Sequence, residues 1–409
     1  MATLLLTLGW CAARGLAPPI ALTVDHGLRK EAAAESKQVA TWARAKGVLH
    51  KILKWEGGKP AGNLQAAARE ARYHLIGAWA RAHGIKTVVT GHTLDDQAET
   101  VLIRLGRGSG VDGLSGMAPV SSFPLRAFDD LSVARPVLGF SHRRLIATLQ
   151  AAKQPWIEDP SNAAMRFQRT RLRAAHTALE AAGLTPERLA DTAAHLRRAR
   201  QAIERSVDAL LAASARPSPW GYILLSRCDF RAAPAEIGLR ALARLIAAVG
   251  GDYYAPRFEA LEAVWTWIAA DEEQSGRTLG GCRLVRRRDE TLLIAREESA
   301  VATESLRLAP GEGKIWDGRF RVALGAATGG AFDVRPLGAK GLAQAGPGVE
   351  LPPVEPRLIA KTTPALWTGA RLIAAPLLRY KADETAAARF SVEFLGLAKG
   401  KGIAKGKPL

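Results

Sequence analysis

Cysteine is scarce in this sequence, with three in 409 residues. Cys11, Cys228 and Cys282 lie far apart and outside any Cys-x-x-Cys pair. Disulfide frameworks and cysteine-bound zinc or iron–sulfur sites need several closely spaced cysteines. The sequence therefore excludes both kinds of site and fits a protein of the reducing cytoplasm.

Acidic residues are also few compared with basic ones. The 39 Asp and Glu stand against 57 Lys and Arg, which gives a formal net charge of +18. Such an excess is typical of proteins that bind polyanions, and a nucleic acid is the first expected partner. With 48% hydrophobic and 23% charged residues, the chain has a globular composition rather than a disordered or collagen-like one.

No apolar run is long enough to span a membrane. Residues 1–24 come nearest, but Arg14, Pro18 and Pro19 interrupt them, and a span needs about 20 apolar residues. A secretory signal carries basic residues ahead of its apolar run, and none precedes this one. We therefore expect no membrane partner, and instead a buried helix over 2–14 that turns into a strand.

Strands and helices alternate through the first part of the chain. This alternation predicts parallel strands joined by right-handed crossovers, with ligands at the carboxyl ends of the strands. The loops 25–27 and 91–96 leave two such ends, so we expect both to face one crevice. The expected strands cover 20–24, 48–53 and 87–90, and the expected helices cover 32–46, 63–83 and 93–105.

The alternation stops after about residue 176. Residues 180–215 and 235–270 have helical apolar spacing, and strand-like runs follow at 276–296 and 305–335. The expected fold class is α/β, a Rossmann-like parallel sheet followed by a helical domain and a small mixed domain. The expected boundaries are 1–176 for the sheet domain, 177–299 for the helical domain, 300–398 for the mixed α/β domain and 399–409 for a basic tail.

One segment places a histidine and two carboxylates at the start of a helix: Gly91-His-Thr-Leu-Asp-Asp-Gln-Ala-Glu-Thr100. Thr93 and Asp96 have the spacing of a capping box, and acids in the first turn favour the positive end of the helix. His92 supports a second interpretation, because a histidine and two carboxylates can transfer protons and bind magnesium-bound phosphate. Both interpretations stay open, and no metal ligand is assigned.

Arginines and glycines follow the same helix in Arg104-Leu-Gly-Arg-Gly-Ser-Gly110. This segment is either a helix end cap or a loop that brings backbone donors to an anion. On the helix 63–83, Arg69, Arg72 and Tyr73 share one face. A solvated basic face is the commoner explanation for such a set.

Four arginines without an intervening acid lie at positions 166, 169, 171 and 173, after Trp156-Ile-Glu-Asp-Pro-Ser-Asn162. Charge runs are usually solvated faces. Here the interleaved Phe167 and the basic excess of the whole chain favour contacts with RNA phosphates.

Four segments together resemble bacterial tRNA(Ile)-lysidine synthases, a family of PP-loop ATP pyrophosphatases. They are Thr23-Val-Asp-His-Gly-Leu-Arg29, the segment 91–100, Arg107-Gly-Ser-Gly-Val-Asp-Gly-Leu114 and the segment 156–162, in matching order and spacing. Weaker similarities follow in Gly250-Gly-Asp-Tyr-Tyr-Ala-Pro-Arg257, Thr278-Leu-Gly-Gly-Cys282, Trp316-Asp-Gly-Arg-Phe320 and Thr363-Pro-Ala-Leu-Trp367. The resemblance therefore covers nearly the whole chain.

The resemblance implies a ligase that uses ATP with Mg²⁺. Such an enzyme adenylates the carbonyl oxygen at position 2 of the wobble cytosine in tRNA(Ile) with a CAU anticodon, and pyrophosphate leaves. The amine of free lysine then displaces AMP and forms lysidine. The implied partners are this tRNA and lysine, and a homodimer is left open.

The resemblance also implies roles for individual residues. The nucleotide pocket would contain Val24, His26 and Gly91. The catalytic group would consist of His92, Asp95 and Asp96. The tRNA would contact Arg104, Arg107, Arg166, Arg169, Arg171 and Arg173.

One motif of PP-loop proteins is not in the sequence, namely the Ser-Gly-Gly-x-Asp-Ser loop that wraps the ATP phosphates after the first strand. The helix over 2–14 is the one expected after that loop. We therefore expect the sequence to begin at an internal methionine, without the first strand, and catalysis to depend on the loop. The alternatives are a non-catalytic tRNA-binding protein and a PP-loop tRNA thiolase, and three isolated cysteines disfavour the thiolase.

Overall fold

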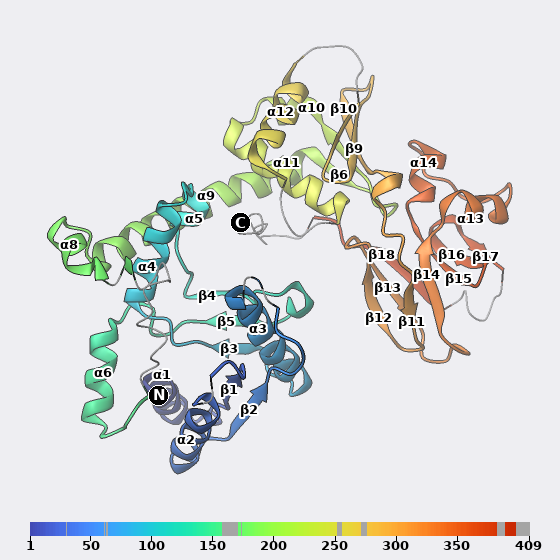
Figure 1. Ribbon diagram of the computed structural model, residues 1–409. Coiled ribbons are helices and arrows are strands. Elements are labelled where there is room, and N and C mark those ends of the chain that lie inside the picture. The colour runs from blue at the N-terminus through green and yellow to red at the C-terminus, as the bar shows by residue number, and fades with distance from the viewer. Residues whose placement is uncertain are drawn as a thin grey trace. The chain divides into compact units, whose positions relative to one another are not determined.

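The chain separates into two compact units, Met1–Gln201 and Ala202–Leu409 (Figure 1). We describe each unit by itself. The expected domain boundaries at 176, 299 and 398 stay predictions. The computed structural model describes residues 1–29, 31–60, 62, 64–157, 171–172, 174–251, 256–270, 276–382 and 389–397.

Unit 1 begins with the expected alternation of helices and strands. Parallel pairing is confirmed for β1 with β2, where Val24 is opposite Leu53. The bounds are α1 (Ala2–Ala13), β1 (Ala21–Asp25), α2 (Ala32–Ala45), β2 (His50–Lys54) and α3 (Leu64–Ala82).

The rest of unit 1 contains a second, mixed sheet. β3 pairs in parallel with β5, and β4 pairs antiparallel with β5. Among the described residues, the order β3-β5-β4 is separate from β1-β2, so the expected single sheet is divided. The bounds are β3 (Thr87–Val89), α4 (Leu94–Leu105), α5 (Val111–Leu114), β4 (Val120–Ser122), η1 (Arg126–Phe128), β5 (Ser132–Ala134), α6 (His142–Ala151) and α8 (His176–Ala181).

Aromatic side chains fill the core beneath the β3-β5-β4 sheet. Tyr73 of α3 packs edge-on against Phe123, with ring centroids 5.5 Å apart, and Phe128 joins the same buried cluster. A Cβ on Gly77 would lie 2.5 Å from the Phe128 ring, so this helix position requires glycine. The helix expected at the start of the chain is α1, which packs through Ala2 against α6. Its expected burial is wrong, because only Ala2 and Cys11 are buried and Leu6 and Trp10 are exposed.

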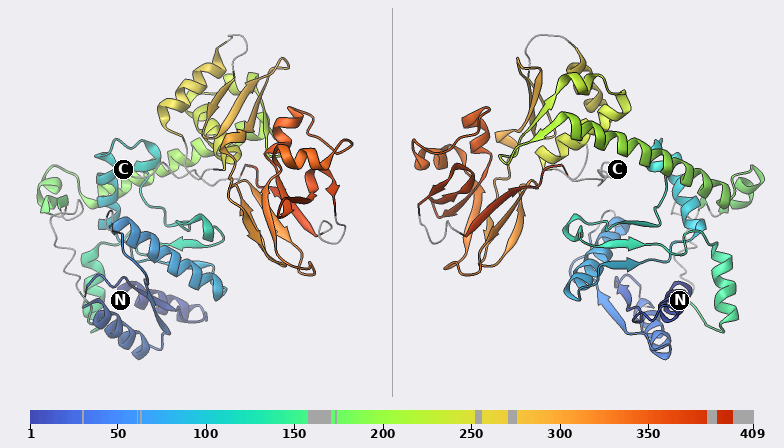
Figure 2. Two further views of the ribbon diagram at one scale, coloured as in Figure 1. Left: turned by 45° about the vertical axis from the view of Figure 1, so that its right-hand side comes forward. Right: turned by 180° about the vertical axis from the view of Figure 1, so that it is seen from behind.

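Helix α9 (Pro186–Ser214) is the longest described helix, and it runs without a break in both views of Figure 2. Its sequence is rich in Ala and Arg, and exposed residues occur along its whole length. None of the described helices has both the length and the apolar character needed to cross a bilayer.

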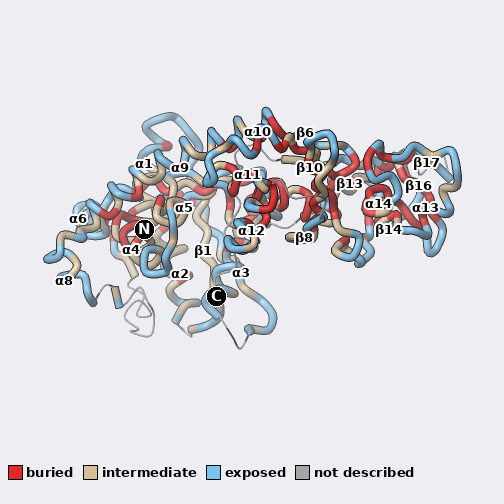
Figure 3. The backbone as a smooth tube through the Cα atoms, turned by 90° about the horizontal axis from the view of Figure 1, so that it is seen from above, coloured by how far each residue is buried: buried red, intermediate tan, exposed pale blue. Residues whose placement is uncertain are grey.

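Unit 2 opens with helices packed on a five-stranded antiparallel sheet of order β6-β7-β10-β9-β8. Helix α11 is buried over most of its length (Figure 3), because its apolar residues pack with the inward residues of β7, β9 and β10. The bounds are β6 (Ala215–Pro217), β7 (Ile223–Ser226), α10 (Arg227–Arg231), α11 (Ala235–Gly250), α12 (Phe258–Ala269), β8 (Arg277–Leu279), β9 (Cys282–Arg286) and β10 (Thr291–Arg296).

The helices α9, α11 and α12 and the strands β8 to β10 agree with the sequence expectation for 180–296. The strands β6 and β7 were not expected, since they lie almost wholly within residues 216–234, between the two stretches expected to be helical. Each is short, and β6 contains Pro217, so neither carries a clear alternating pattern. Their pairing with each other and with β10 stabilises them instead.

The remainder of unit 2 holds two antiparallel sheets, of order β11-β14-β15-β16-β17 and β12-β13-β18. A shared core of Trp316, Phe320 and Leu366 packs between them. The bounds are β11 (Leu306–Leu308), β12 (Gly313–Trp316), β13 (Phe320–Leu324), β14 (Phe332–Pro336), α13 (Gly338–Ala345), α14 (Pro356–Lys361), β15 (Pro364–Thr368), β16 (Arg371–Ala375), β17 (Tyr380–Lys381) and β18 (Phe390–Phe394).

A buried ionic group, which we call the Asp317 cluster, consists of Arg296, Asp317 and Arg319. Oδ1 of Asp317 accepts a hydrogen bond from Nη2 of Arg296 at 2.9 Å, and its Oδ2 accepts one from Nε of Arg319 at 2.7 Å. The Asp317 side chain is 3% exposed and that of Arg319 is 0% exposed. Burial lowers the pKa of Arg319 to about 10, although Asp317 opposes this effect, so the guanidinium stays charged at neutral pH.

The Asp317 cluster brings together segments from different parts of unit 2. Nη1 of Arg296 donates to the carbonyl of Gly250 at 2.6 Å, and Nη2 of Arg319 donates to that of Thr362 at 2.8 Å. The backbones approach so closely that a Cβ on Gly251 would lie 2.1 Å from the carbonyl oxygen of Asp317. Gly250, Gly251 and Gly281, which belong to the weaker family similarities, therefore lie with the segment 316–320 around a single buried carboxylate.

Candidate active site

The start of α4 forms the expected capping box. The backbone N–H of Asp96 donates to Oγ1 of Thr93 at 3.3 Å, and Oδ2 of Asp96 accepts from the Thr93 N–H at 2.8 Å and from its hydroxyl at 2.9 Å. The capping interpretation is confirmed for these two residues. It leaves Oδ1 of Asp96 outside the hydrogen bonds of the described residues, so a ligand can still reach this carboxylate.

Asp95 is fixed by a different helix. Its Oδ2 accepts a hydrogen bond of 2.7 Å from the backbone N–H of His142, the first residue of α6. The N–H of Leu94 donates to the carbonyl of Phe140 at 3.0 Å and holds the same two segments together. Asp95 and Asp96 are therefore rigid neighbours at the positive end of α4.

His92 and Gly91 lie just before these carboxylates. Nδ1 of His92 and Oγ1 of Thr90 share a hydrogen bond of 2.9 Å. A Cβ on Gly91 would lie 2.7 Å from Oγ1 of Thr3, so a larger residue at this position would require the Thr3 side chain of α1 to move. The segment 91–96 thus presents an imidazole and two carboxylates from a backbone that is held on both sides.

Gln97 and Arg104 hold the loop that follows α4. The Gln97 amide donates to the carbonyl of Met117 at 3.0 Å and accepts from its N–H at 2.7 Å. Nη1 of Arg104 donates to the carbonyls of Gly113 and Gly116 at 2.8 and 3.0 Å. Sequence reasoning missed the role of Gln97, whose signal was its place inside the motif 91–100.

The other expected loop follows β1, where Oδ1 of Asp25 accepts from the Gly27 N–H at 2.9 Å. His26 is the residue between Asp25 and Gly27, and its Nε2 lies 3.3 Å from Nε and 3.1 Å from Nη2 of Arg72. Arg72 can only donate, so this imidazole is neutral and its proton is on Nδ1. The structure therefore gives Arg72 of α3 a partner in the expected nucleotide pocket.

Trp55 and Lys59 adjoin this loop, and sequence reasoning did not single them out. The Trp55 N–H donates to the carbonyl of Asp25 at 2.9 Å, and its ring meets the His26 ring edge-on at 5.9 Å. The Lys59 ammonium lies 4.0 Å from the centre of the Trp55 ring. An aromatic ring and three nitrogen-bearing side chains thus gather at the carboxyl ends of β1 and β2, a setting suited to an anionic nucleotide.

We expect the stability of the protein to decrease as the pH falls below about 6.5, in part through His26. Burial, followed by the nearby Arg72, lowers the pKa of His26, whereas Asp25 opposes them. The unfolded chain then takes up a proton before the folded chain does, so acidification favours unfolding and the loss is absent above the unfolded-state pKa.

The test is a set of urea unfolding curves between about pH 5 and pH 8 for the wild type and His26→Gln. The variant should show a flatter profile. A remaining slope is expected from His50, whose pKa is also lowered by burial and then by Arg44. An identical slope in both proteins would contradict the role given to His26.

The arginines expected to bind tRNA differ in how the structure presents them. Arg104 is half-buried against the loop carbonyls described above, whereas Arg107 and Arg171 are exposed. Arg166, Arg169 and Arg173 lie outside the described residues, as does most of the segment 156–162. An RNA role for these six arginines stays a prediction.

Comparison with known proteins agrees with this architecture. Residues 1–178 match the family model of the PP-loop domain, so the fold and the site define a PP-loop protein. The tRNA(Ile)-lysidine synthase of Ruegeria pomeroyi is 38% identical over 367 residues, which cover 90% of this chain and 83% of that protein. This chain therefore belongs to the tRNA(Ile)-lysidine synthase family, as the sequence motifs predicted.

Further relatives show the same relationship. The tRNA(Ile)-lysidine synthase of Methylobacterium nodulans is 48% identical over 61% of this chain and 73% of its own length. That of Wolbachia pipientis is 35% identical over 80% of this chain and 75% of its own length. A solved U34-tRNA thiolase from Methanococcus maripaludis aligns with 48% of this chain and 68% of its own at 14% identity and a TM-score of 0.40.

The carboxylates of the site fit a magnesium ion that arrives with phosphate. Among the described residues, no three His, Cys, Asp or Glu side chains form a metal-binding group of their own. Magnesium needs only one or two protein carboxylates when phosphates and water complete its shell. The hydrogen bonds of the described residues use Oδ2 of Asp95 and of Asp96, which leaves Oδ1 of each carboxylate for such an ion.

Proposed function

We propose that this protein attaches lysine to the wobble cytidine of tRNA(Ile) with a CAU anticodon, in an ATP-dependent reaction that forms lysidine. The observation that carries the proposal is the 38% identity to a tRNA(Ile)-lysidine synthase over 90% of the chain. The basic excess of the chain suits a tRNA substrate. We place the reaction in the cytoplasm, with free lysine as the second substrate. A homodimer is left open.

The proposed reaction has two chemical requirements that residues at the start of α4 can meet. The departing pyrophosphate must be stabilised, and the lysine ammonium must lose a proton before its amine attacks. We assign both tasks to the group of His92, Asp95 and Asp96. Thr90, Thr93 and the N–H of His142 hold these three side chains in place, so little reorganisation is needed during the reaction.

A magnesium ion, when bound with ATP, would neutralise phosphate charge and thereby favour departure of pyrophosphate. Asp95 and Asp96 would hold it through Oδ1. His26 and Arg72 would contact the nucleotide at the carboxyl end of β1. Val24, a residue of this strand, would line the nucleotide pocket.

The proposal is tested with the protein expressed from its own gene, ATP, labelled lysine and a tRNA(Ile) transcript. Label should enter the transcript with cytidine at the wobble position, and AMP and pyrophosphate should form in equal amounts. A matched transcript with uridine at that position should stay unlabelled. Equal labelling of both transcripts, or none with a proven lysidine substrate, would refute the proposal.

The thiolase alternative has no support from the cysteines. Cys11 and Cys282 are buried, Cys228 is exposed, and all three are free thiols. The non-catalytic alternative is decided by the same labelling experiment.

A further inference from the structure

The chain that leaves β2 forms a short turn over residues 55–59, which we call the Trp55 turn. Gly57 has φ at 88°, a left-handed backbone conformation that favours glycine and lets the chain fold back. Nζ of Lys59 donates a hydrogen bond of 2.6 Å to the carbonyl of Trp55 and lies 4.0 Å from the centre of its ring. The Trp55 N–H donates to the carbonyl of Asp25 at 2.9 Å. The Trp55 ring is therefore held by its own backbone and by a cation over one face.

The imidazole of His26 packs against this ring. The two ring centres lie 5.9 Å apart, and the ring planes are nearly perpendicular, at 88°. Nε2 of His26 faces the Arg72 guanidinium, but its Nδ1 is buried and has no hydrogen-bond partner among the described residues. A functional histidine is often oriented by a hydrogen bond at its second nitrogen. Here the contact with Trp55 orients the imidazole instead.

The charged groups that face His26 are Arg72, Asp25 and Lys59. Burial and then Arg72 lower the pKa of His26, Asp25 opposes them, and Lys59 lowers it further. A protonated imidazole would turn an N–H toward the Arg72 guanidinium, which can only donate. The contact between His26 and Arg72 therefore needs the neutral imidazole. Trp55, which covers the ring, and Lys59, through its charge, both favour that form.

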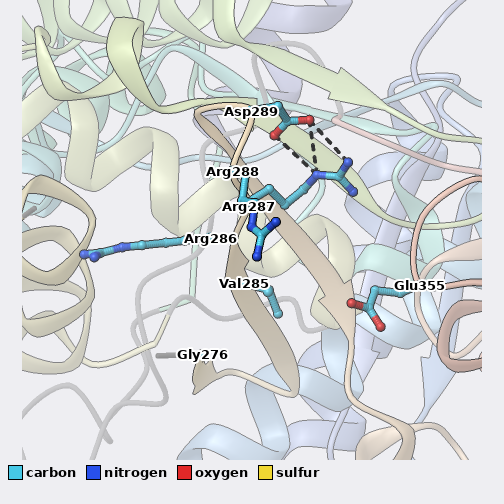
Figure 4. A pocket seen from close by; sticks show the side chains of 7 residues that line it. All are labelled: Gly276, Val285, Arg286, Arg287, Arg288, Asp289 and Glu355. Atoms are coloured by element: carbon cyan, nitrogen blue, oxygen red, sulfur yellow. Dashed lines mark hydrogen bonds and ion pairs between the residues drawn. The ribbon is translucent and has the colours of Figure 1, made fainter. Parts of the chain in front are cut away.

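Another cation lies over an indole ring in unit 2, at a cavity of about 520 Å³ between β9 and β10 and the start of α14 (Figure 4). There the Arg286 guanidinium lies 4.5 Å from the centre of the Trp267 ring. Among the described residues that line this cavity there is no histidine. The Trp55 turn differs from it, because its indole also orients a titratable ring.

From this geometry we propose that Trp55 and Lys59 are positioning residues for ATP, which hold the His26 ring in the orientation in which His26 and Arg72 receive the nucleotide. The inference rests on the proposed function for its choice of ATP. Neither residue has to touch the nucleotide, because Trp55 acts through His26 and Lys59 acts through Trp55. Loss of either side chain should weaken ATP binding and leave tRNA binding and the later steps unchanged.

The test measures lysidine formation at varied ATP with saturating lysine and tRNA. Trp55→Ala should raise KM for ATP about threefold to tenfold at unchanged kcat, since a side chain that is no longer held must be ordered on binding. Trp55→Phe keeps an aromatic ring and should return KM to within about twofold of the wild type. Lys59→Met should raise KM about twofold to fivefold, the effect of one lost cation–π contact.

The pH profile of kcat/KM for ATP separates positioning from a merely structural role. In Trp55→Ala the imidazole of His26 gains access to water, so its pKa rises toward the ordinary value of about 6.5 and the acidic limb moves to higher pH. Trp79→Ala is the matched control. Trp79 stacks on His83 with ring centres 3.9 Å apart at the carboxyl end of α3, and its loss should change neither KM nor the profile.

A raised KM in Trp55→Ala and Lys59→Met, with rescue by Trp55→Phe and an unchanged control, supports the proposal. An unchanged KM in Trp55→Ala, a loss confined to kcat, or equal impairment in Trp55→Phe would overturn it. If Trp55→Ala does not fold, Lys59→Met decides, and an unchanged KM in that variant overturns the proposal.

A measurement without turnover separates this inference from the proposed reaction. In protein labelled at histidine Cε1, the NMR signal of His26 is the one that is missing in His26→Gln. ATP should shift this signal in the wild type, and the same ATP concentration should shift it less in Trp55→Ala. If the signal responds in this way and no lysidine forms, the proposed reaction fails and the positioning role stands. If lysidine forms and the signal does not respond to ATP, the positioning role fails and the reaction stands.

Discussion

Replacing Asp317 by alanine is expected to lower the free energy of unfolding by about 3–5 kcal/mol, because the change leaves two buried guanidinium groups without their carboxylate. The charge of Arg319 cannot reach water, since its side chain is 0% exposed. The Ala302 N–H, which donates to Oδ1 of Asp317 at 2.9 Å, loses its acceptor as well. Urea unfolding followed by tryptophan fluorescence measures the change, and Trp316 next to Asp317 reports on it.

Asp333→Ala provides the control for this prediction. Asp333 pairs with Arg307 at 3.0 Å, but that arginine is 66% exposed, and exposed pairs contribute about 0–1 kcal/mol. A loss of similar size in both variants would contradict the special role of the Asp317 cluster.

Asp96→Asn is expected to reduce lysidine formation by about 10²–10⁴-fold while tRNA affinity changes less than about threefold. The carboxylate acts on phosphate and proton chemistry in this proposal, whereas an RNA strand is drawn by cations. Single-turnover lysine incorporation and filter binding measure the two quantities separately.

The capping box requires its own control, because Asp96 also stabilises α4. Thr93→Ala removes the capping hydroxyl and keeps the carboxylate, at a cost of about 0.5–2 kcal/mol in stability. If the two variants lost the same activity, capping alone would explain the role of Asp96. A much smaller loss in Thr93→Ala assigns the difference to the carboxylate.

The local features of this protein were predictable, whereas its long-range contacts were not. The alternation of apolar runs and caps gave the helices and parallel strands up to residue 105, and the spacing of Thr93 and Asp96 gave the capping box. No sequence pattern joins Asp95 to the N–H of His142, or Gln97 to Met117, because these partners are 47 and 20 residues apart. Short strands such as β4 and β6 depend on their neighbours, so they carry no periodic signal of their own.

The candidate site was also predictable only in part. The motif 91–100 and the loop 25–27 were found from residue types at strand ends, but Trp55 and Arg72 needed the fold. The sequence placed Arg72 on a basic face of a helix. Its contact with His26 could not be predicted, because it depends on the packing of α3 beside β1.

The Asp317 cluster also has a consequence for the order in which the nascent chain can mature. Arg296 leaves the ribosome before Asp317, and Arg319 leaves it well before Thr362, whose carbonyl it requires. Until that carbonyl is synthesised, the partly made unit carries arginines that have no place in an apolar interior. We therefore expect the final packing of this segment to follow the emergence of residue 362 from the ribosome.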